Sequence, residues 1–165
     1  MDAPAVPLAQ AVKNRYPNLV SGVEVTPAGQ TVIAKREGIR ALAQALKTDP
    51  EFRFSMLMDL FAADYLHWEE KESRFEVVYN LFSPERGHRL FVKVLLSEAD
   101  PSVDSVTTVW PAANWYERET WDMMGITFSG HPDPRRILMY ESFQGHALRK
   151  DYRYNQRQPL IGPLN

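Results

Sequence analysis

The densest cluster of charged and aromatic side chains in this chain of 165 residues spans residues 115–125. On a helix, Arg118 lies four residues before Asp122 and can pair with it, and Glu117 and Glu119 lie in the same turns. Paired carboxylates can hydrolyse a glycosidic bond, but they must face each other across a gap that holds the sugar. Adjacent turns of one helix do not create that gap easily, so the spacing argues against this chemistry.

A second chemistry that such side chains could support is metal binding. No two of the histidines stand at the i, i+3 or i, i+4 spacing of helix-borne ligands, and no HExxH motif occurs. His131 and Asp133 could offer two ligands, but a third would have to come from a distant part of the chain. Alternatively His131 and His146, which each follow a glycine, are hydrogen-bonded structural groups. A stand-alone metal-binding domain is therefore a minor alternative.

Basic side chains gather after the acidic helix. Residues 131–157 contain six arginines and lysines against three acidic residues, a local charge of about +3, with tyrosine and phenylalanine between them. Basic and aromatic residues in alternation can bind RNA, but the whole chain has a net charge of −2 and no RNA-binding motif. The acidic helix and the basic segment could also be solvated, or could pair with each other. Trp, Tyr and Arg are concentrated after residue 110, which is typical of a protein interface.

Cysteine is absent from the chain. This excludes a disulfide framework, a thiolate nucleophile, cysteine-ligated zinc and most iron–sulfur clusters. The first ten residues contain no basic residue, so we expect no secretory signal. No apolar run reaches the roughly 18 residues of a membrane span. We therefore expect a soluble chain, or one attached to a membrane only through other proteins.

Apolar periodicity predicts the elements that position these residues. Helices are predicted from Leu8 to the residues before Pro17, and from Ile39 to Asp49. Two short strands, 22–26 and 30–34, are joined by the loop 27–29. Periodicity alone does not decide whether residues 55–66 form a helix or a strand.

The clearest hairpin joins strands 75–82 and 89–96 through the loop 83–87, which contains both Pro and Gly. A further helix is predicted from Pro111 to Gly125, where glycine can adopt a left-handed cap. Residues 126–165 then show no lasting period but remain too apolar for a disordered tail. Such a segment either wraps its own domain or lies on a partner. We therefore divide the chain into a core domain, 1–125, and an extended partner-binding segment, 126–165.

Several ordered motifs make the chain resemble a known family, the thirty-kilodalton subunit (the C subunit) of NADH–quinone oxidoreductase, respiratory complex I. The downstream motifs are ERETWDMMGI (117–126), GHPD (130–133), RRIL (135–138), GH (145–146) and LRKDY (148–152). The upstream motifs are DY (64–65), RFEVVYN (74–80), HRL (88–90) and WPAANW (110–115). The resemblance implies an α+β fold, a small mixed and mostly antiparallel sheet with helices packed on it, and it favours a strand for residues 55–66.

The resemblance also implies a role. The chain would be a docking subunit with no active site or cofactor of its own, in the peripheral arm on the cytoplasmic side of a bacterial inner membrane. Its partners would be the quinone-site (D-like) subunit and the iron–sulfur (B-like and I-like) subunits. Iron–sulfur clusters, FMN, NADH and quinone would belong to those partners. Equivalent subunits of membrane-bound hydrogenases or of ferredoxin- or F420-linked dehydrogenases are the alternative.

The motif residues then become the expected partner interface, with the arginines binding carboxylates or carbonyls of the partner. This set comprises Glu117, Arg118, Glu119, Asp122, Gly125, His131, Pro132, Arg135, Arg136, His146, Arg149, Lys150, Asp151 and Tyr152.

Overall fold

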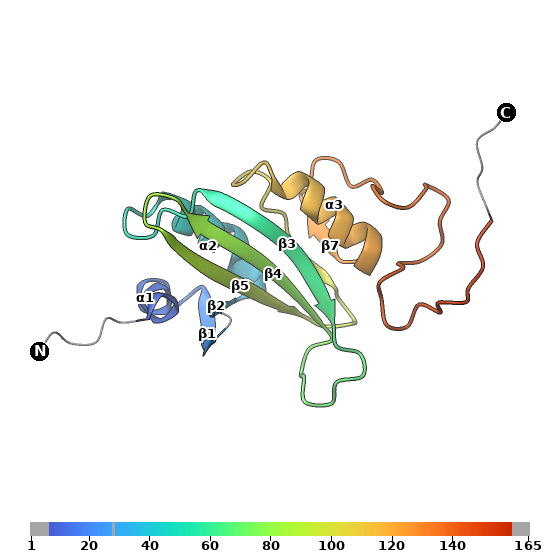
Figure 1. Ribbon diagram of the computed structural model, residues 1–165, viewed down its shortest axis with the longest axis horizontal. Coiled ribbons are helices and arrows are strands. Elements are labelled where there is room, and N and C mark those ends of the chain that lie inside the picture. The colour runs from blue at the N-terminus through green and yellow to red at the C-terminus, as the bar shows by residue number, and fades with distance from the viewer. Residues whose placement is uncertain (1–6, 28, 160–165) are drawn as a thin grey trace, which may run out of the picture.

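Five segments with alternating apolar residues form one mixed sheet (Figure 1). The computed structural model describes residues 7–27 and 29–159. The helices are α1 (Leu8–Arg15), α2 (Ile39–Thr48) and α3 (Ala113–Met124), with a 3-10 turn η1 (Arg36–Gly38) before α2. The strands are β1 (Val20–Thr26), β2 (Gly29–Ala34), β3 (Met56–Asp64), β4 (Phe75–Ser83), β5 (His88–Leu96), β6 (Ser102–Asp104) and β7 (Thr127–Ser129).

The main sheet has the strand order β1-β2-β5-β4-β3. All neighbouring strands are antiparallel except β2 and β5, which run parallel. Because side chains alternate between the two faces of a strand, the paired residues Val77–Val94, Tyr79–Val92 and Leu81–Leu90 share one face and are buried. This face meets the apolar stripe of α2, and α3 packs along the edge strand β3. The predicted α+β class is confirmed.

Most predicted elements are confirmed with small changes at their ends. Residues 55–66 contain the strand β3, as the resemblance implied. The predicted helix start at Pro111 is wrong by two residues, because the turn that precedes α3 is closed by the N–H of Ala113 donating to the carbonyl of Trp110. Gly29 belongs to β2, while Ala28 lies outside the described residues. So do residues 1–6, where no secretory signal was expected, and residues 160–165 at the chain end.

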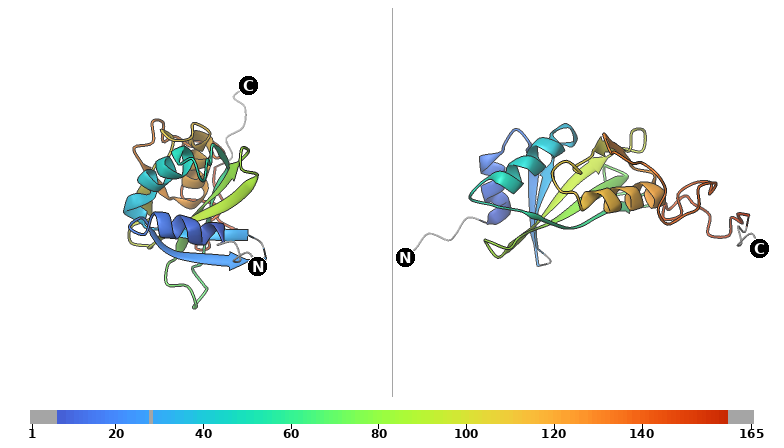
Figure 2. Two further views of the ribbon diagram at one scale, coloured as in Figure 1. Left: turned by 90° about the vertical axis from the view of Figure 1, so that its left-hand side faces the viewer. Right: turned by 90° about the horizontal axis from the view of Figure 1, so that it is seen from above.

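A short ladder that periodicity did not reveal holds both ends of α3. β6 precedes the helix and β7 follows it, and the two pair in parallel over three residues each. Three residues are too few to show an alternating pattern. The ladder fixes the point at which the chain leaves the core. The following segment, which we call the tail (residues 130–159), extends past the end of the sheet, on the side away from α1 (Figures 1 and 2). Within the part of the chain that the structure describes, no helix is long and apolar enough to cross a membrane.

Candidate partner-docking site

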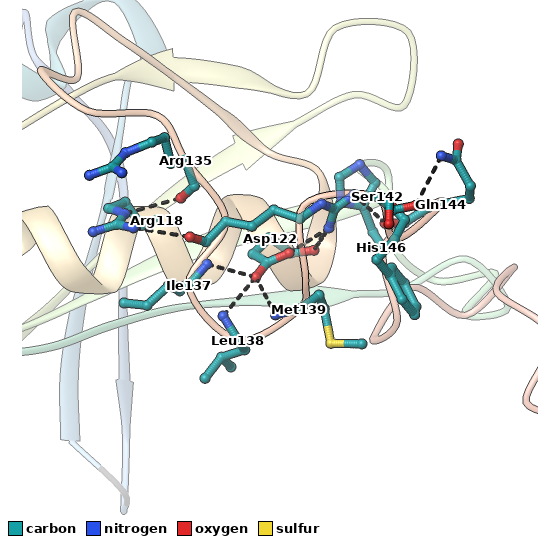
Figure 3. Close-up of polar contacts among 12 residues, drawn as sticks. Arg118, Asp122, Arg135, Ile137, Leu138, Met139, Ser142, Gln144 and His146 are labelled. Atoms are coloured by element: carbon teal, nitrogen blue, oxygen red, sulfur yellow. Dashed lines mark hydrogen bonds and ion pairs between the residues drawn. The ribbon is translucent and has the colours of Figure 1, made fainter. Parts of the chain in front are cut away.

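The carboxylate of Asp122, on the last turn of α3, holds the backbone of the tail. Its Oδ2 accepts hydrogen bonds from the successive N–H groups of Ile137, Leu138 and Met139 at 3.0, 2.9 and 2.9 Å (Figure 3). The carboxylate is fully buried. Burial alone would raise the pKa of Asp122, but these three N–H groups and the guanidinium of Arg136 together lower it below its ordinary value. The charged form therefore carries the contact.

Arg136 joins the same contact from the tail side. One guanidinium nitrogen donates to Oδ1 of Asp122, and another donates to the carbonyls of Phe143 and Gly145 at 2.9 and 3.0 Å. The guanidinium also lies over the rings of Trp121 and Phe143, with distances of 5.5 and 5.6 Å to the centroids. Arg136 is thus occupied within the chain, which is the internal pairing that the sequence analysis left open.

Arg118 acts one turn earlier on α3. Its Nε and Nη2 donate to the carbonyls of Arg135 and Arg136, each at 3.0 Å. Asp122 and Arg118 together supply acceptors and donors to a segment that has no secondary structure of its own. Buried backbone groups without such partners would cost free energy. Side chains of α3 therefore replace the hydrogen bonds that a helix or strand would have given to residues 135–139.

Gly125 and His146 form the next contact. His146 donates from Nδ1 to the carbonyl of Asp122 at 3.0 Å. Gly125 caps α3 with a φ of 74°, and a Cβ at this position would lie 2.6 Å from Cδ2 of His146. Glycine is therefore required here twice, for the left-handed conformation and for the approach of the imidazole ring.

A second contact, formed by Asp64 and Arg74, which the expected interface set did not include, fastens the far part of the tail to the sheet. Arg74 binds Asp64 in a bidentate pair at 3.1 Å and also binds Asp151 at 2.9 Å. The N–H of Lys150 donates to the same Asp64 carboxylate at 2.9 Å. Arg149 lies over the ring of Phe75, 5.1 Å from its centroid.

This second contact is also electrostatically favoured. Burial alone would raise the pKa of Asp64, but the hydrogen bonds from Arg74 and from the Lys150 and Leu66 N–H groups lower it. Asp64 and Arg74 lie at adjoining ends of β3 and β4, and both belong to motifs that carry the family resemblance. Membership of these motifs was the signal in the sequence, because the Asp64–Lys150 contact spans 86 residues and no local spacing indicates it.

The remaining members of the expected set divide between the interior and the surface. Glu117 points into the core, and burial raises its pKa to about 7. His131 packs beside it, and Tyr152 stacks on Phe143 at 5.8 Å. On the surface are Glu119, Pro132, Arg135 and Lys150. Residues 7–27 and 29–159 contain no group of three or more His, Asp or Glu that could hold a metal ion.

While Asp122 holds three backbone N–H groups of the tail from within, several apolar side chains of the tail point outward. Leu138 is 58% exposed and Leu148 55% exposed. Figure 3 shows the side chains of Leu138 and Met139 pointing away from Asp122, which holds their N–H groups from the other side. Tyr154 is 98% exposed. The arrangement presents apolar anchors on a backbone whose hydrogen bonds are already made.

Asp122→Ala should lower the free energy of unfolding by roughly 3–5 kcal/mol, because Arg136 and three N–H groups lose a buried acceptor. Urea denaturation measures this loss, and amide hydrogen exchange should show reduced protection at residues 137–139. The wild-type contribution is present above about pH 3.8, the ordinary Asp value, and is lost as the pH falls through the lowered pKa. Glu119→Ala removes an exposed carboxylate from the same helix and should change stability by about 0.5 kcal/mol or less. Equal losses of unfolding free energy in Asp122→Ala and Glu119→Ala would show that Asp122 does not hold the tail.

Gly125→Ala should destabilise the chain more than Gly87→Ala. Both residues have positive φ, 74° and 65°, so each substitution costs roughly 1–2 kcal/mol of backbone strain. A Cβ at Gly87 meets nothing within 4 Å, whereas one at Gly125 meets the His146 ring. The difference between the two unfolding free energies measures the His146 contact, and no difference would show that the ring moves aside freely.

Comparison with known proteins identifies the family. A family model described as the 30 Kd subunit of respiratory-chain NADH dehydrogenase matches residues 32–158. The C subunit of NADH-quinone oxidoreductase from Roseiflexus castenholzii is 50% identical over 121 residues, which cover 73% of this chain and 68% of that protein. The corresponding protein of Rhodobacter capsulatus is 46% identical over 145 residues, covering 88% of this chain and 71% of that protein.

Solved structures agree with these relatives. A trypsin-resistant fragment (1-134) of Nqo5 superposes with a TM-score of 0.65 at 33% identity, covering 76% of this chain and 98% of the fragment. A chain of an archaeal membrane-bound sulfane sulfur reductase has a TM-score of 0.58 at 22% identity, covering 75% of this chain and 69% of that one, and shows the shared fold alone. The chain therefore belongs to the family of the C subunit of NADH-quinone oxidoreductase, the 30 Kd subunit of respiratory-chain NADH dehydrogenase.

Proposed function

We propose that the chain is a docking subunit, without a catalytic site of its own, in the peripheral arm of a proton-translocating NADH–quinone oxidoreductase. It holds the quinone-site (D-like) and iron–sulfur (B-like and I-like) subunits together on the cytoplasmic side of the bacterial inner membrane. It reaches the membrane only through these partners. Iron–sulfur clusters, FMN, NADH and quinone are bound by the partner subunits. Residues 1–125 act as the platform and residues 126–165 as the partner-binding segment.

The observation that carries this proposal is the opposite orientation of backbone N–H groups and the leucine side chain in residues 137–139. The backbone of residues 137–139 is held from within by Asp122, while Leu138 stays 58% exposed. An exposed leucine on a held backbone loses little conformational entropy when a partner covers it. A few side chains that become buried on contact supply most of the binding energy in protein interfaces. The tail therefore has the properties of a preorganised docking surface.

Charged residues supplement the apolar anchors. The Arg135 side chain is 72% exposed although it pairs with Asp133 in the tail, and Lys150 is exposed as well. Both can approach carboxylates or carbonyls of a partner subunit, as the expected interface requires. Arg136 and Arg149 contribute differently, because they hold the tail in shape by binding groups of this chain. Their roles are to position the surface that the partner meets.

The acidic residues of the site are already bound within the chain, which supports a docking role over a catalytic one. Asp122, Asp64 and Asp151 all bind arginines of the same chain. A general acid or base needs a free path to a substrate proton. These carboxylates are directed at backbone N–H groups and guanidinium groups instead.

Replacing both exposed leucines should weaken assembly. The double variant Leu138→Ser, Leu148→Ser removes two anchors, and burial of a leucine contributes about 1.5–3 kcal/mol. Since about 1.4 kcal/mol corresponds to a tenfold change, we expect recovery of partner subunits to fall by roughly tenfold or more. The measurement is a pull-down of the tagged chain from gently solubilised native membranes, with the co-eluting proteins identified and NADH-driven quinone reduction assayed.

The matched control is Val25→Ser, which replaces an apolar side chain that is 61% exposed on β1, away from the tail. It should leave recovery unchanged. Equal recovery of partner subunits with the wild type, the double leucine variant and the Val25→Ser control would contradict the docking role of the tail. A wild-type chain that elutes alone would contradict docking altogether. Recovery of a nickel hydrogenase subunit would keep the docking role and change the enzyme.

A further inference from the structure

The carboxyl group of Glu117 is enclosed between α3 and the sheet, and the docking role makes no use of it. Its Oε1 accepts a hydrogen bond from the N–H of Val106 at 2.7 Å. Its Oε2 has no hydrogen-bond partner among the described residues, and the side chain is fully buried. A buried polar atom of this kind costs free energy unless it carries a proton or meets a water molecule. Oε2 is therefore a candidate for proton binding.

His131 lies beside Glu117 at the start of the tail, with Nε2 4.0 Å from Oε2. Its Nδ1 accepts a hydrogen bond from the N–H of Asp133 at 3.0 Å. This nitrogen therefore carries no proton, and the proton of the neutral ring sits on Nε2, which donates to the carbonyl of Asn114 at 3.1 Å.

A small cavity connects the two groups. It has a volume of about 40 Å³ and is lined by Glu117, His131, Arg118, Trp121, Thr127, Phe128 and Pro134. A cavity needs about 10–15 Å³ to hold one water molecule, so a water can enter and carry a proton to Oε2.

We propose that Glu117 and His131 form a buried proton-binding site, which holds a proton on the Glu117 carboxyl while the root of the tail, residues 131–134, is seated on α3. A proton on Oε2 makes the buried carboxyl neutral and leaves the hydrogen bond from the N–H of Asp133 to His131 intact. Without the proton, a carboxylate with one hydrogen bond stays buried, and the root of the tail must open before water can reach it. Loss of the proton therefore loosens the root of the tail.

The surroundings favour the protonated carboxyl. Burial raises the pKa of Glu117 to about 7, and the hydrogen bonds from Ser105 and Val106 and the charge of Arg40 oppose this only in part. The groups near Glu117 on neighbouring elements are Tyr79 on β4, Arg40 on α2, Ser105 in the loop after β6 and His131 in the tail. Arg118 on α3 lines the same cavity, and Asp104 on β6 acts on Tyr79. The Tyr79 hydroxyl is itself buried without a partner among the described residues. Arg40 is directed at the carbonyls of Ser105 and Ser129 and at Asp104.

The linkage to stability has a definite sign. In the unfolded chain Glu117 has its ordinary pKa of 4.5, whereas in the folded chain the value is about 7. Between these two values the unfolded state loses its proton and the folded state keeps it. The contribution of Glu117 to stability is thus fully present below about pH 4.5 and is lost as the pH rises through about 7.

Two measurements on the full chain test this site. Carbon-13 NMR of the labelled Glu117 carboxyl should give a titration midpoint near 7. Over the same range the protection factor of the Asp133 amide should fall roughly tenfold, because ionisation of the buried carboxyl favours the open form of the root. In Glu117→Gln the pH dependence at Asp133 should disappear. In Glu119→Gln, which changes an exposed residue of the same helix, it should persist.

A Glu117 midpoint near the ordinary 4.5 would overturn the proposal. So would Asp133 protection that shows no titration near 7 in the wild type, or that keeps the same pH dependence in Glu117→Gln. If Glu117→Gln does not fold, the two wild-type titrations decide alone. Neither readout involves a partner protein, so a failure here is separate from a failure of the docking role.

Discussion

Backbone N–H and carbonyl groups in a segment without helix or strand still need hydrogen-bond partners, and α3 supplies them to the tail of this chain. Asp122 accepts from three successive N–H groups, and Arg118 donates to two carbonyls just before them. Arg136 returns from the tail to the same carboxylate. The path of residues 135–139 therefore depends on one face of one helix, and the side chain of Leu138 is left facing outward.

The sheet and the short β6–β7 ladder give α3 its fixed place. α3 packs along β3, and the ladder joins the residues before the helix to those after it. The Arg74 contact with Asp64 and Asp151 then fastens the tail again, close to the ends of β3 and β4. Two separate ionic contacts hold one irregular segment at two points. The same core also encloses Glu117, so the root of the tail can respond to a single proton.

Local pattern was sufficient for most of the fold. The hairpin of β4 and β5 followed from alternation around a Pro- and Gly-containing loop, and α2 followed from its apolar stripe. Periodicity left β3 undecided, and the family resemblance favoured a strand. The roles of the charged motif residues were less predictable, because charges on a helix can face solvent, a partner or the chain itself. The partners of the Asp122 carboxylate lie 14 to 17 residues away along the chain, and those of the Asp64 carboxylate lie up to 86 residues away. The spacing rules for helices and strands predict contacts only between residues a few positions apart, so they do not predict these pairs.

If the docking proposal holds, the inward polar contacts of the tail leave Leu138 facing a partner protein. The most direct measurement places a photo-crosslinking amino acid at position 138 in native membranes and, in a separate strain, at position 25 on β1. If Leu138 faces a partner, position 138 forms covalent crosslinks to another protein of the oxidoreductase and position 25 forms none. Absence of crosslinks from position 138 in an assembled, active complex would contradict it.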